Sequence, residues 1–365
     1  MQNIAVKTKP DKLDEQNNNV NKRSTYLDVV KAFAIICVIF GHCIQYGSGS
    51  NYLKGDLFLD NIIFKIIYSF HMPLFMLVSG YLFAHSVKGK TWTKILINRI
   101  RTLLLPILMW MALPFIIVMI YALGNSNVEC IAALNNCVST SLSNLWFLWA
   151  VFWCSLVVTI VSRFFKDSKI VYLLGFVLTF FVPDIMYLNL YKFMYPYFVV
   201  GYFYNKDGYV KKLNKICNYP YTLLALGVVF GILLFFYDRD AYIYTTGYCV
   251  LGKGVLRQTI IDIYRCTIGF IGSAFVLLVF LRLKDKFVRV SEKILKFIGV
   301  NTLGIYIISG FIFTYVFNRV TENIVTINYI MTIIETIIVL VVSLVCTCII
   351  KKNKYLNMLL LGGRT

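Results

Sequence analysis

The chain has 365 residues, of which 59% are hydrophobic, 16% aromatic and only 15% charged. This balance lies far from that of a soluble domain, so the composition excludes a water-soluble protein and indicates one that is embedded in lipid. The formal net charge of +19 could suggest a nucleic-acid partner. The basic residues gather between apolar segments, however, so we expect the lipid bilayer as the partner and no nucleic acid.

Apolar runs of spanning length predict an all-α fold, a polytopic integral membrane bundle of about ten transmembrane helices. The runs lie at residues 26–46, 61–84, 100–122, 144–163, 170–188, 190–204, 219–237, 260–281, 299–317 and 326–350. Most Lys and Arg residues fall in segments that face the cytoplasm if the N-terminus is inside, so the positive-inside rule predicts that both termini are cytoplasmic. Four basic residues remain within the predicted helices: Lys31, Lys65, Lys192 and Arg265.

The hydropathy pattern divides the chain into three regions. Residues 1–22 are polar and predict a disordered cytoplasmic tail. Residues 23–352 form the transmembrane domain, and residues 353–365 form a cytoplasmic C-terminal tail. Cys130 and Cys137 fall in a predicted outer loop, where they either form a disulfide or are two small buried side chains.

The first predicted helix carries a base near each end. His42 follows Lys31 by three turns of helix plus about 20°, so the two side chains share one stripe about 16 Å apart. An ionisable group inside a bilayer usually faces the interior of the bundle and serves a function. The alternative is a histidine that is merely satisfied by a hydrogen bond to a neighbouring helix.

Lys31 has two interpretations of its own. It lies close to the cytoplasmic end of the helix, so its ammonium group could reach the lipid headgroups. Asp28, three residues earlier, can pair with it on the same helix. An anchoring lysine and a functional cation therefore both remain open.

The second predicted helix combines polar and helix-breaking residues. Between residues 66 and 83 it contains His71, Pro73, Ser79 and Gly80. Pro73 removes a backbone hydrogen bond, and Gly80 permits close helix approach, so we expect a broken helix that faces a cavity. Helix packing alone is the alternative explanation.

Five blocks in order resemble the membrane-bound acyltransferase family known as acyltransferase 3. They read RSTYLDVVKAFAIICVIFGH, FHMPLFMLVSGYLF, KILINRIRTLLLP, LWFLWAVF and NTLGIYIISG. The resemblance covers most of the chain and is densest over residues 23 to 106. The signature of that family is a basic residue, ten further residues and a histidine, which Lys31 and His42 match. Two positions depart from the family pattern: Thr102 stands where a second arginine is frequent, and Ser309 where a histidine is usual.

The resemblance implies an enzyme that moves an acetyl or other short acyl group onto a hydroxyl of a surface sugar. A neutral imidazole suits removal of the hydroxyl proton, so His42 is the candidate general base, with Lys31 and His71 as further catalytic candidates. The implied donor is acetyl-CoA or another acyl-CoA, and no metal is expected.

Coenzyme A carries several phosphate charges, so we expect its head among cations at the cytoplasmic mouth. The candidates are Arg99, Arg101 and Lys31, with Ser79 assigned to donor binding as well. Topology signalling is the alternative for the two arginines. Trp146 and Trp149 are candidates for stacking on the sugar acceptor, although an aromatic belt at the outer interface would also explain them.

The expected partners are an acyl-CoA inside and a glycan or lipid-linked sugar outside, with the chain in a bacterial plasma (inner) membrane; a homo-oligomer is left open. A polysaccharide or lipid-linked sugar transporter or flippase, with Lys31 and His42 as a proton relay, is the alternative from another class. A third reading is an acyltransferase-like module that only senses or assembles with partners.

Overall fold

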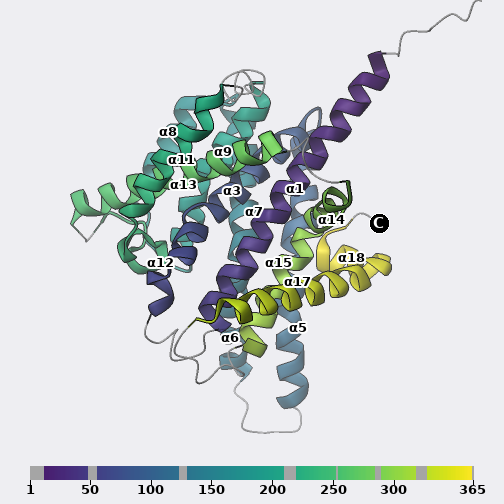
Figure 1. The fold of residues 1–365 in the computed structure, drawn as a ribbon. Helices are drawn as coiled ribbons and strands as arrows, with labels where there is room; N and C mark the ends of the chain where they lie inside the picture. Colours follow the sequence, from purple (N-terminus) through teal and green to yellow (C-terminus); the bar gives the residue numbers. More distant parts are fainter. Residues whose placement is uncertain are drawn as a thin grey trace, which may run out of the picture.

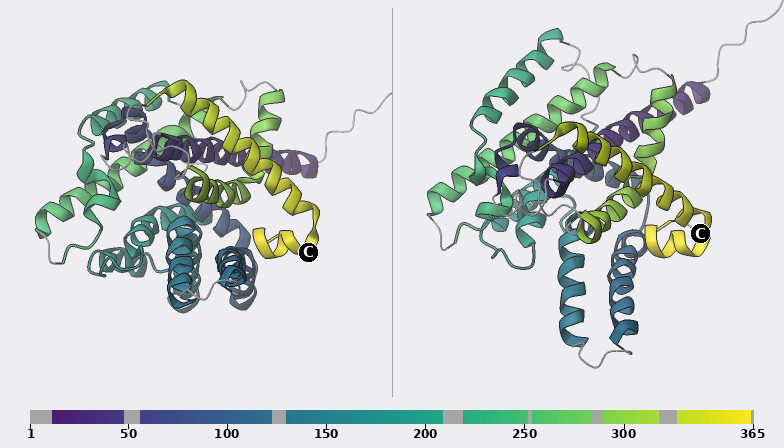
Figure 2. Two further views of the ribbon diagram at one scale, coloured as in Figure 1. Left: turned by 90° about the horizontal axis from the view of Figure 1, so that it is seen from below. Right: turned by 60° about the horizontal axis from the view of Figure 1, so that its bottom comes forward.

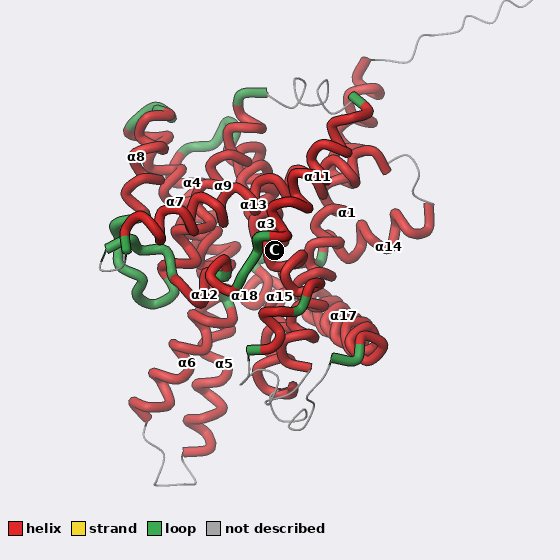
Figure 3. Tube along the Cα trace, turned by 60° about the vertical axis from the view of Figure 1, so that its left-hand side comes forward, coloured by secondary structure: helices red, strands yellow, loops and turns green. Residues whose placement is uncertain are grey.

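The computed structural model describes residues 12–47, 56–122, 130–208, 219–251, 254–283, 289–317 and 327–363. Within these ranges the chain is helical and contains no β-strand (Figures 1 and 3). The predicted all-α class is therefore confirmed for the described part of the chain.

The first half of the bundle, up to residue 164, is formed by long helices and one π-helical turn, η2. Their bounds are α1 Lys12–Gly47, η1 Leu57–Asp60, α3 Ile62–Val87, α4 Trp92–Arg99, η2 Ile100–Leu104, α5 Leu105–Ala122, α6 Cys130–Asn144 and α7 Trp146–Phe164. The second half contains more short helices. They are α8 Lys169–Thr179, α9 Leu188–Lys206, α11 Pro220–Phe235, η3 Arg239–Ala241, α12 Ile243–Thr246, α13 Val255–Leu283, α14 Arg289–Val300, α15 Thr302–Ile312, η4 Phe313–Phe317, α17 Tyr329–Lys352 and α18 Lys354–Leu361.

Six helices of the described chain are long and apolar enough to cross a membrane, and a seventh span arises if the bent pair α14 and α15 counts as one. That pair is bent by 70°. Among the segments expected to span, α8 and α11 are shorter apolar helices. Pro183, four residues beyond the end of α8, prevents the helical hydrogen-bond pattern from continuing through the rest of the predicted 170–188 span. The count of ten and the orientation of the termini stay predictions.

Two segments that were expected to be irregular are helical. Helix α1 begins at Lys12, within the predicted disordered tail, whereas residues 1–11 lie outside the described residues. The predicted outer loop after residue 122 contains α6, which runs beside α5 in a projecting hairpin (Figures 1 and 2). On α6, Cys137 is a free, buried cysteine, and the side chain of Cys130 lies outside the described part.

Helices α3 and α9 approach each other closely in the core. A Cβ atom added at Gly80 would meet the backbone of Phe198, and one added at Gly201 would meet the backbone of Leu77. Small residues of this kind let two helix backbones touch inside a bilayer, where apolar burial alone gives little drive for association. The expected role of Gly80 in close helix approach is confirmed.

Helix α3 is not broken at Pro73, so that expectation was wrong. It continues as one α-helix from Ile62 to Val87 with the proline inside it. A neighbouring helix contacts this turn: the Ser273 hydroxyl on α13 donates at 3.4 Å to the carbonyl of Phe70, the residue after Ser69, whose carbonyl loses its helical donor to Pro73. Polar side chains from adjacent helices commonly replace backbone hydrogen bonds around a transmembrane proline.

Candidate active site

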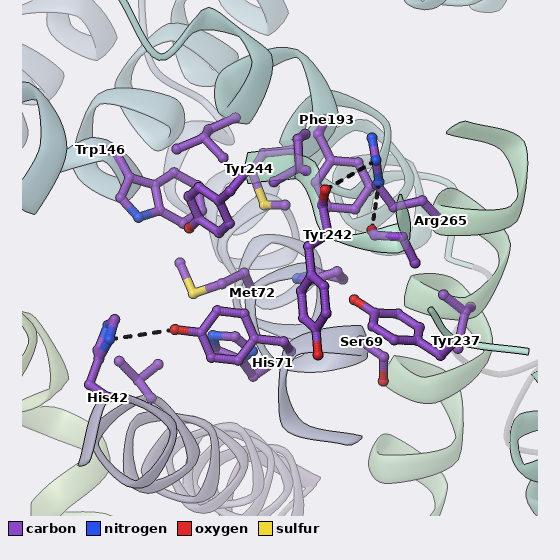
Figure 4. Close-up of a pocket in the computed structure, with 18 of the residues that line it drawn as sticks. His42, Ser69, His71, Met72, Trp146, Phe193, Tyr237, Tyr242, Tyr244 and Arg265 are labelled. Carbon is purple, nitrogen blue, oxygen red and sulfur yellow. Dashed lines mark hydrogen bonds between the residues drawn. The ribbon is translucent and has the colours of Figure 1, made fainter. Parts of the chain in front are cut away.

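A cavity inside the bundle brings together residues from several helices. α1, α3, α7, α9, α13 and α15 contribute to its wall, together with the connection between α11 and α13. Aromatic and aliphatic side chains form most of it, and the polar groups include His42, His71, Ser69 and Arg265 (Figure 4). Such a mostly apolar pocket with a few convergent polar groups is the usual form of a small-molecule site.

His42 lies on the cavity side of α1 and is half-buried. Its Nδ1 atom is 3.3 Å from Oε1 of Gln45 and 3.5 Å from the hydroxyl of Tyr68. The Tyr68 hydroxyl also donates to Oε1 of Gln45 at 3.3 Å. Because an amide oxygen only accepts, Nδ1 of His42 carries the proton in this arrangement, which leaves Nε2 as the basic nitrogen.

His71 lines the same cavity from α3 and is buried. Its Nδ1 atom donates to the backbone carbonyl of Ile67 at 2.7 Å, so its Nε2 is also the unprotonated nitrogen of the neutral ring. The ring of Tyr68 lies 4.8 Å from the His71 ring and 6.4 Å from the His42 ring. The structure therefore brings the two predicted histidines together around one tyrosine.

The predicted donor-binding residues do not line this cavity. Nζ of Lys31 pairs with Oδ1 of Asp28 at 2.7 Å on α1, and both side chains are partly buried. The Arg99 guanidinium lies 4.8 Å above the Phe83 ring, and its Nη2 donates to the hydroxyl of Ser86 at 2.8 Å. Lys31 and Arg99 thus bind separate partners on separate helices.

The other two donor candidates are Arg101 and Ser79. Arg101 lies in the π-helical turn η2, which begins directly after Arg99. Ser79 is half-buried on α3, about two turns beyond His71. The Nε atom of Arg99 is buried and has no hydrogen-bond partner among the described residues. A buried donor without a partner is uncommon, and a bound anion would satisfy it.

The two tryptophans predicted to bind the acceptor, Trp146 and Trp149, lie in different surroundings. Trp146 lines the cavity, whereas Trp149 packs against a smaller apolar cluster formed with Ile107, Leu148 and Ile307. The Nε1 atom of Trp149 is buried without a hydrogen-bond partner in the described chain. The structure brings only Trp146 next to the histidines.

Thr102 and Ser309, the two departures from the family pattern, have local partners. Thr102 Oγ1 donates to the Asn98 carbonyl at 2.7 Å. Ser309 is buried on α15 and donates to the carbonyl of Tyr306, which lines the cavity, at 3.2 Å. A serine at this position therefore stays within its own helix and presents no base to the cavity.

Gln45, Tyr68 and Arg265 were not predicted as site residues. Arg265 on α13 lines the cavity and is buried, and its Nη1 donates to Oδ1 of the buried Asp262 at 2.7 Å. The sequence did offer a signal for Arg265, because it is an arginine within an apolar span. Gln45 and Tyr68 gave no comparable signal, because uncharged polar residues are ordinary in membrane helices. In the described residues, no group of three or more His, Cys, Asp or Glu side chains could hold a metal ion.

Comparison with known proteins assigns the chain to a family. A family model described as an acyltransferase domain matches residues 24–352. The nodulation protein NolL of Mesorhizobium japonicum is 28% identical over 231 residues, which cover 61% of this chain and 59% of the relative. The nodulation protein NolL of Sinorhizobium fredii is 28% identical over 225 residues, covering 61% of this chain and 60% of the relative.

This chain therefore spans about 60% of the length of the curated relatives that it matches. No solved structure matches it significantly. The family model, by contrast, covers most of the chain, including the helices that carry Lys31, His42 and His71. From this coverage it follows that the chain belongs to the acyltransferase 3 family, as the resemblance of its sequence blocks predicted.

Proposed function

We propose that this chain is a membrane-bound O-acyltransferase of a bacterial plasma membrane. It transfers an acetyl or other short acyl group from a coenzyme A thioester to a hydroxyl of a surface glycan or lipid-linked sugar. The observation that carries the proposal is the placement of His42 in an aromatic-lined cavity, with Gln45 on its Nδ1 side. A base whose other nitrogen is oriented by a neighbour is the arrangement that activates hydroxyl nucleophiles.

The chemical step needs one base and no change of redox state. As the acceptor hydroxyl attacks the thioester carbonyl carbon, Nε2 of His42 takes the hydroxyl proton. The new C–O bond forms, the C–S bond breaks, and the imidazolium returns the proton to the departing thiolate. His71, on the far side of Tyr68, presents a second unprotonated nitrogen and is the alternative base for removal of the hydroxyl proton.

The donor head is proposed to bind away from the histidines. Arg99, Arg101 and Lys31 supply positive charge, and the unpartnered Nε of Arg99 supports an anionic ligand beside it. The thin pantetheine arm then extends from these cations past Ser79 toward the cavity. Trp146 lines the acceptor side of the same cavity.

Replacement of His42 by Gln tests this function. Loss of the base should lower kcat of acyl transfer at least about 100-fold while the protein still inserts into the membrane. His85→Gln is the matched control, because His85 lies exposed in the last turn of α3. A His42→Gln enzyme with substantial activity would contradict the assignment.

A transporter with a proton relay is the competing function. A relay from Lys31 to His42 requires proton carriers between two groups about 16 Å apart on one helix. Lys31 instead pairs with Asp28, and of these two relay groups His42 lines the cavity whereas Lys31 does not. These contacts favour acyl transfer, and salt-sensitive binding of an acyl-CoA to the purified protein would separate the two functions.

A further inference from the structure

The connection between α11 and α13 folds back against the cavity. We call residues 239–248, which include η3 and α12, the strap. Four consecutive strap residues, Ala241 to Tyr244, line the cavity that contains His42. In Figure 4, Tyr242 lies between His71 and Arg265.

Arg265 binds the strap mainly through backbone atoms. Its Nε donates to the Ala241 carbonyl at 2.9 Å, its Nη1 to the Gly247 carbonyl at 2.8 Å and its Nη2 to the Asp240 carbonyl at 3.1 Å. Nη2 also donates to the Thr246 hydroxyl at 2.6 Å. One buried guanidinium therefore holds both ends of a ten-residue segment.

The charge of Arg265 is already compensated. Nη1 also contacts Oδ1 of Asp262 at 2.7 Å, and Asp262 is fully buried. Gln258 Nε2 reaches both the Asp262 carboxylate and the Gly247 carbonyl at 3.2 Å. Because every guanidinium nitrogen has a partner in the protein, Arg265 is suited to hold the strap rather than to bind an anionic substrate.

Further polar contacts fix the strap outside the cavity. Arg239 forms an exposed pair with Asp60, with Nε to Oδ1 at 3.1 Å and Nη2 to Oδ2 at 2.5 Å. At the other end, Oδ2 of Asp184 accepts from the backbone N–H of Tyr248 at 2.6 Å and from that of Cys249 at 2.9 Å. Exposed Arg257 also pairs with Asp240 of the strap. The strap is thus held by one buried arginine and two exposed ones, so the exposed Arg239 can be compared with the buried Arg265.

Of the three strap tyrosines, the two that line the cavity, Tyr242 and Tyr244, differ in their exposure. Tyr242 is buried, donates to the Leu59 carbonyl at 3.0 Å and packs its ring 6.3 Å from Tyr68. Tyr244 is 56% exposed although it lines the cavity, so its ring lies at the rim. Trp146 lines the cavity on the same side as Tyr244 in Figure 4. These two side chains offer apolar faces with polar edges to a molecule that enters the cavity.

We propose that the strap is the wall that selects the acceptor, that Tyr244 contacts the acceptor's sugar ring, and that Arg265 is the positioning residue that holds the strap. The proposal rests on the proposed acyl transfer, since an acceptor must exist for it to be selected. It assigns the strap no part in binding the donor.

Hydrogen–deuterium exchange of Arg265→Lys against Arg239→Lys tests the anchor without any substrate. Lysine keeps one positive charge beside Asp262 but cannot donate in the several fixed directions of a guanidinium. Amide exchange within residues 239–248 should therefore rise at least about tenfold in Arg265→Lys. In Arg239→Lys it should change little, because exposed ion pairs contribute little to stability. Equal exchange in the two variants would show that Arg265 does not hold the strap.

Steady-state kinetics test acceptor selection. Tyr244→Ala should raise the acceptor KM about tenfold while the donor KM stays unchanged, and Arg265→Lys should show the same split. Tyr221→Ala is the control, because Tyr221 is an exposed tyrosine of α11 away from the cavity. A rise in donor KM, or a fall in kcat alone, would overturn the selecting role.

Different results would contradict the proposed acyl transfer and the proposed role of the strap. If the wild-type protein transfers no acyl group to any sugar, the proposed function is wrong and acceptor selection falls with it. If the wild type is active but Tyr244→Ala has unchanged kinetics, acyl transfer stands and the strap assignment is wrong. The exchange measurement decides the role of Arg265 in either case.

Discussion

At the scale of single residues, the candidate site depends on how each histidine is oriented. The Nδ1 atom of His42 faces the side-chain oxygen of Gln45, and that of His71 donates to a backbone carbonyl. Both imidazoles are therefore directed so that Nε2 is available as a base. Gln45 is the group that determines this for His42, one turn further along α1.

Gln45→Ala should lower kcat about tenfold without changing either KM, because a hydrogen bond worth about 1 kcal/mol no longer selects the reactive tautomer. Tyr68→Phe removes the 3.5 Å contact to His42 and the 3.3 Å bond to Gln45 but leaves the Gln45 oxygen beside Nδ1, so it should have a smaller effect on kcat. The measurement is initial-rate kinetics at saturating donor. A changed acceptor KM with unchanged kcat would show that Gln45 contacts substrate instead.

Arg99→Ala should weaken donor binding more than Arg99→Lys, since a positive charge near the buried Nε position is proposed to meet the coenzyme A phosphates. The wild-type affinity should fall as salt rises, and that dependence should become shallower in the Ala variant. Lys88→Ala, an exposed cation just beyond the end of α3, is the control. Donor affinity can be measured by calorimetry in detergent, and identical affinities in wild type and Arg99→Ala would refute the role.

Charged residues in apolar helices were the part of the site that the sequence could predict. His42 and His71 were identified because an ionisable group in lipid is costly and so usually has a function. Gln45 and Tyr68 could not be identified, since neither is costly to bury when hydrogen-bonded. Trp149 was grouped with Trp146 by proximity in sequence, but it lies about one turn further along α7, where it packs against the cluster of Ile107, Leu148 and Ile307 and does not line the cavity.

At the scale of helices and connections, the pair α3 and α9 sets the geometry of the core. Their backbones touch through Gly80 and Gly201, and both helices contribute residues to the cavity. The spacing of the cavity wall therefore depends on two positions that have no side chain. This contact was predictable from Gly80 on α3, although its partner helix was not.

Gly80→Ala should destabilise the protein by about 1–3 kcal/mol, because the added methyl group meets the Phe198 backbone, which cannot move aside. Gly231→Ala on α11 should be neutral or slightly stabilising, since an added Cβ there meets no atom within 4 Å and alanine favours a helix. Thermal unfolding in one detergent compares the two variants. Similar midpoints for both would contradict the close packing of α3 and α9.

Connections and helix ends were the elements that the sequence predicted poorly. Residues 238–254 contain no long apolar run, so nothing local indicated that residues 241–244 line the cavity; their course depends on bonds from Arg265, far along the chain. Helix α6 and the start of α1 gave no helix signal because neither contains an apolar run of spanning length. The start of α1 is mostly polar, and α6 mixes apolar residues with Asn, Ser and Thr.

At the scale of the whole molecule, the depth of His42 in the bilayer bears on the side of the membrane from which each substrate arrives. If α1 enters the bilayer from the cytoplasm near Tyr26, His42 lies about 24 Å along it, beyond the middle of a hydrocarbon core of about 30 Å. The proposed donor is made in the cytoplasm, whereas surface glycans are completed outside. The orientation of the chain therefore decides from which side each substrate must arrive.

In sealed vesicles of known orientation, acyl-CoA supplied to the cytoplasmic side should acylate a sugar acceptor supplied only to the outer side. The donor head would stay among Lys31, Arg99 and Arg101, and only its acyl end would reach His42. Vesicles of reversed orientation are the control and should show no transfer under the same additions. Transfer that requires both substrates on the cytoplasmic side would disprove a trans-bilayer mechanism even if His42 proved essential.

The way in which Arg265 holds the strap has an evolutionary consequence. Its principal contacts are backbone carbonyls, those of Asp240, Ala241 and Gly247, and every amino acid supplies such a carbonyl. Mutations that change strap side chains to which Arg265 does not bind, such as that of Tyr244, therefore leave these bonds in place. A lineage of such proteins could exchange the surface that faces the cavity one side chain at a time, while the helices around His42 keep their packing.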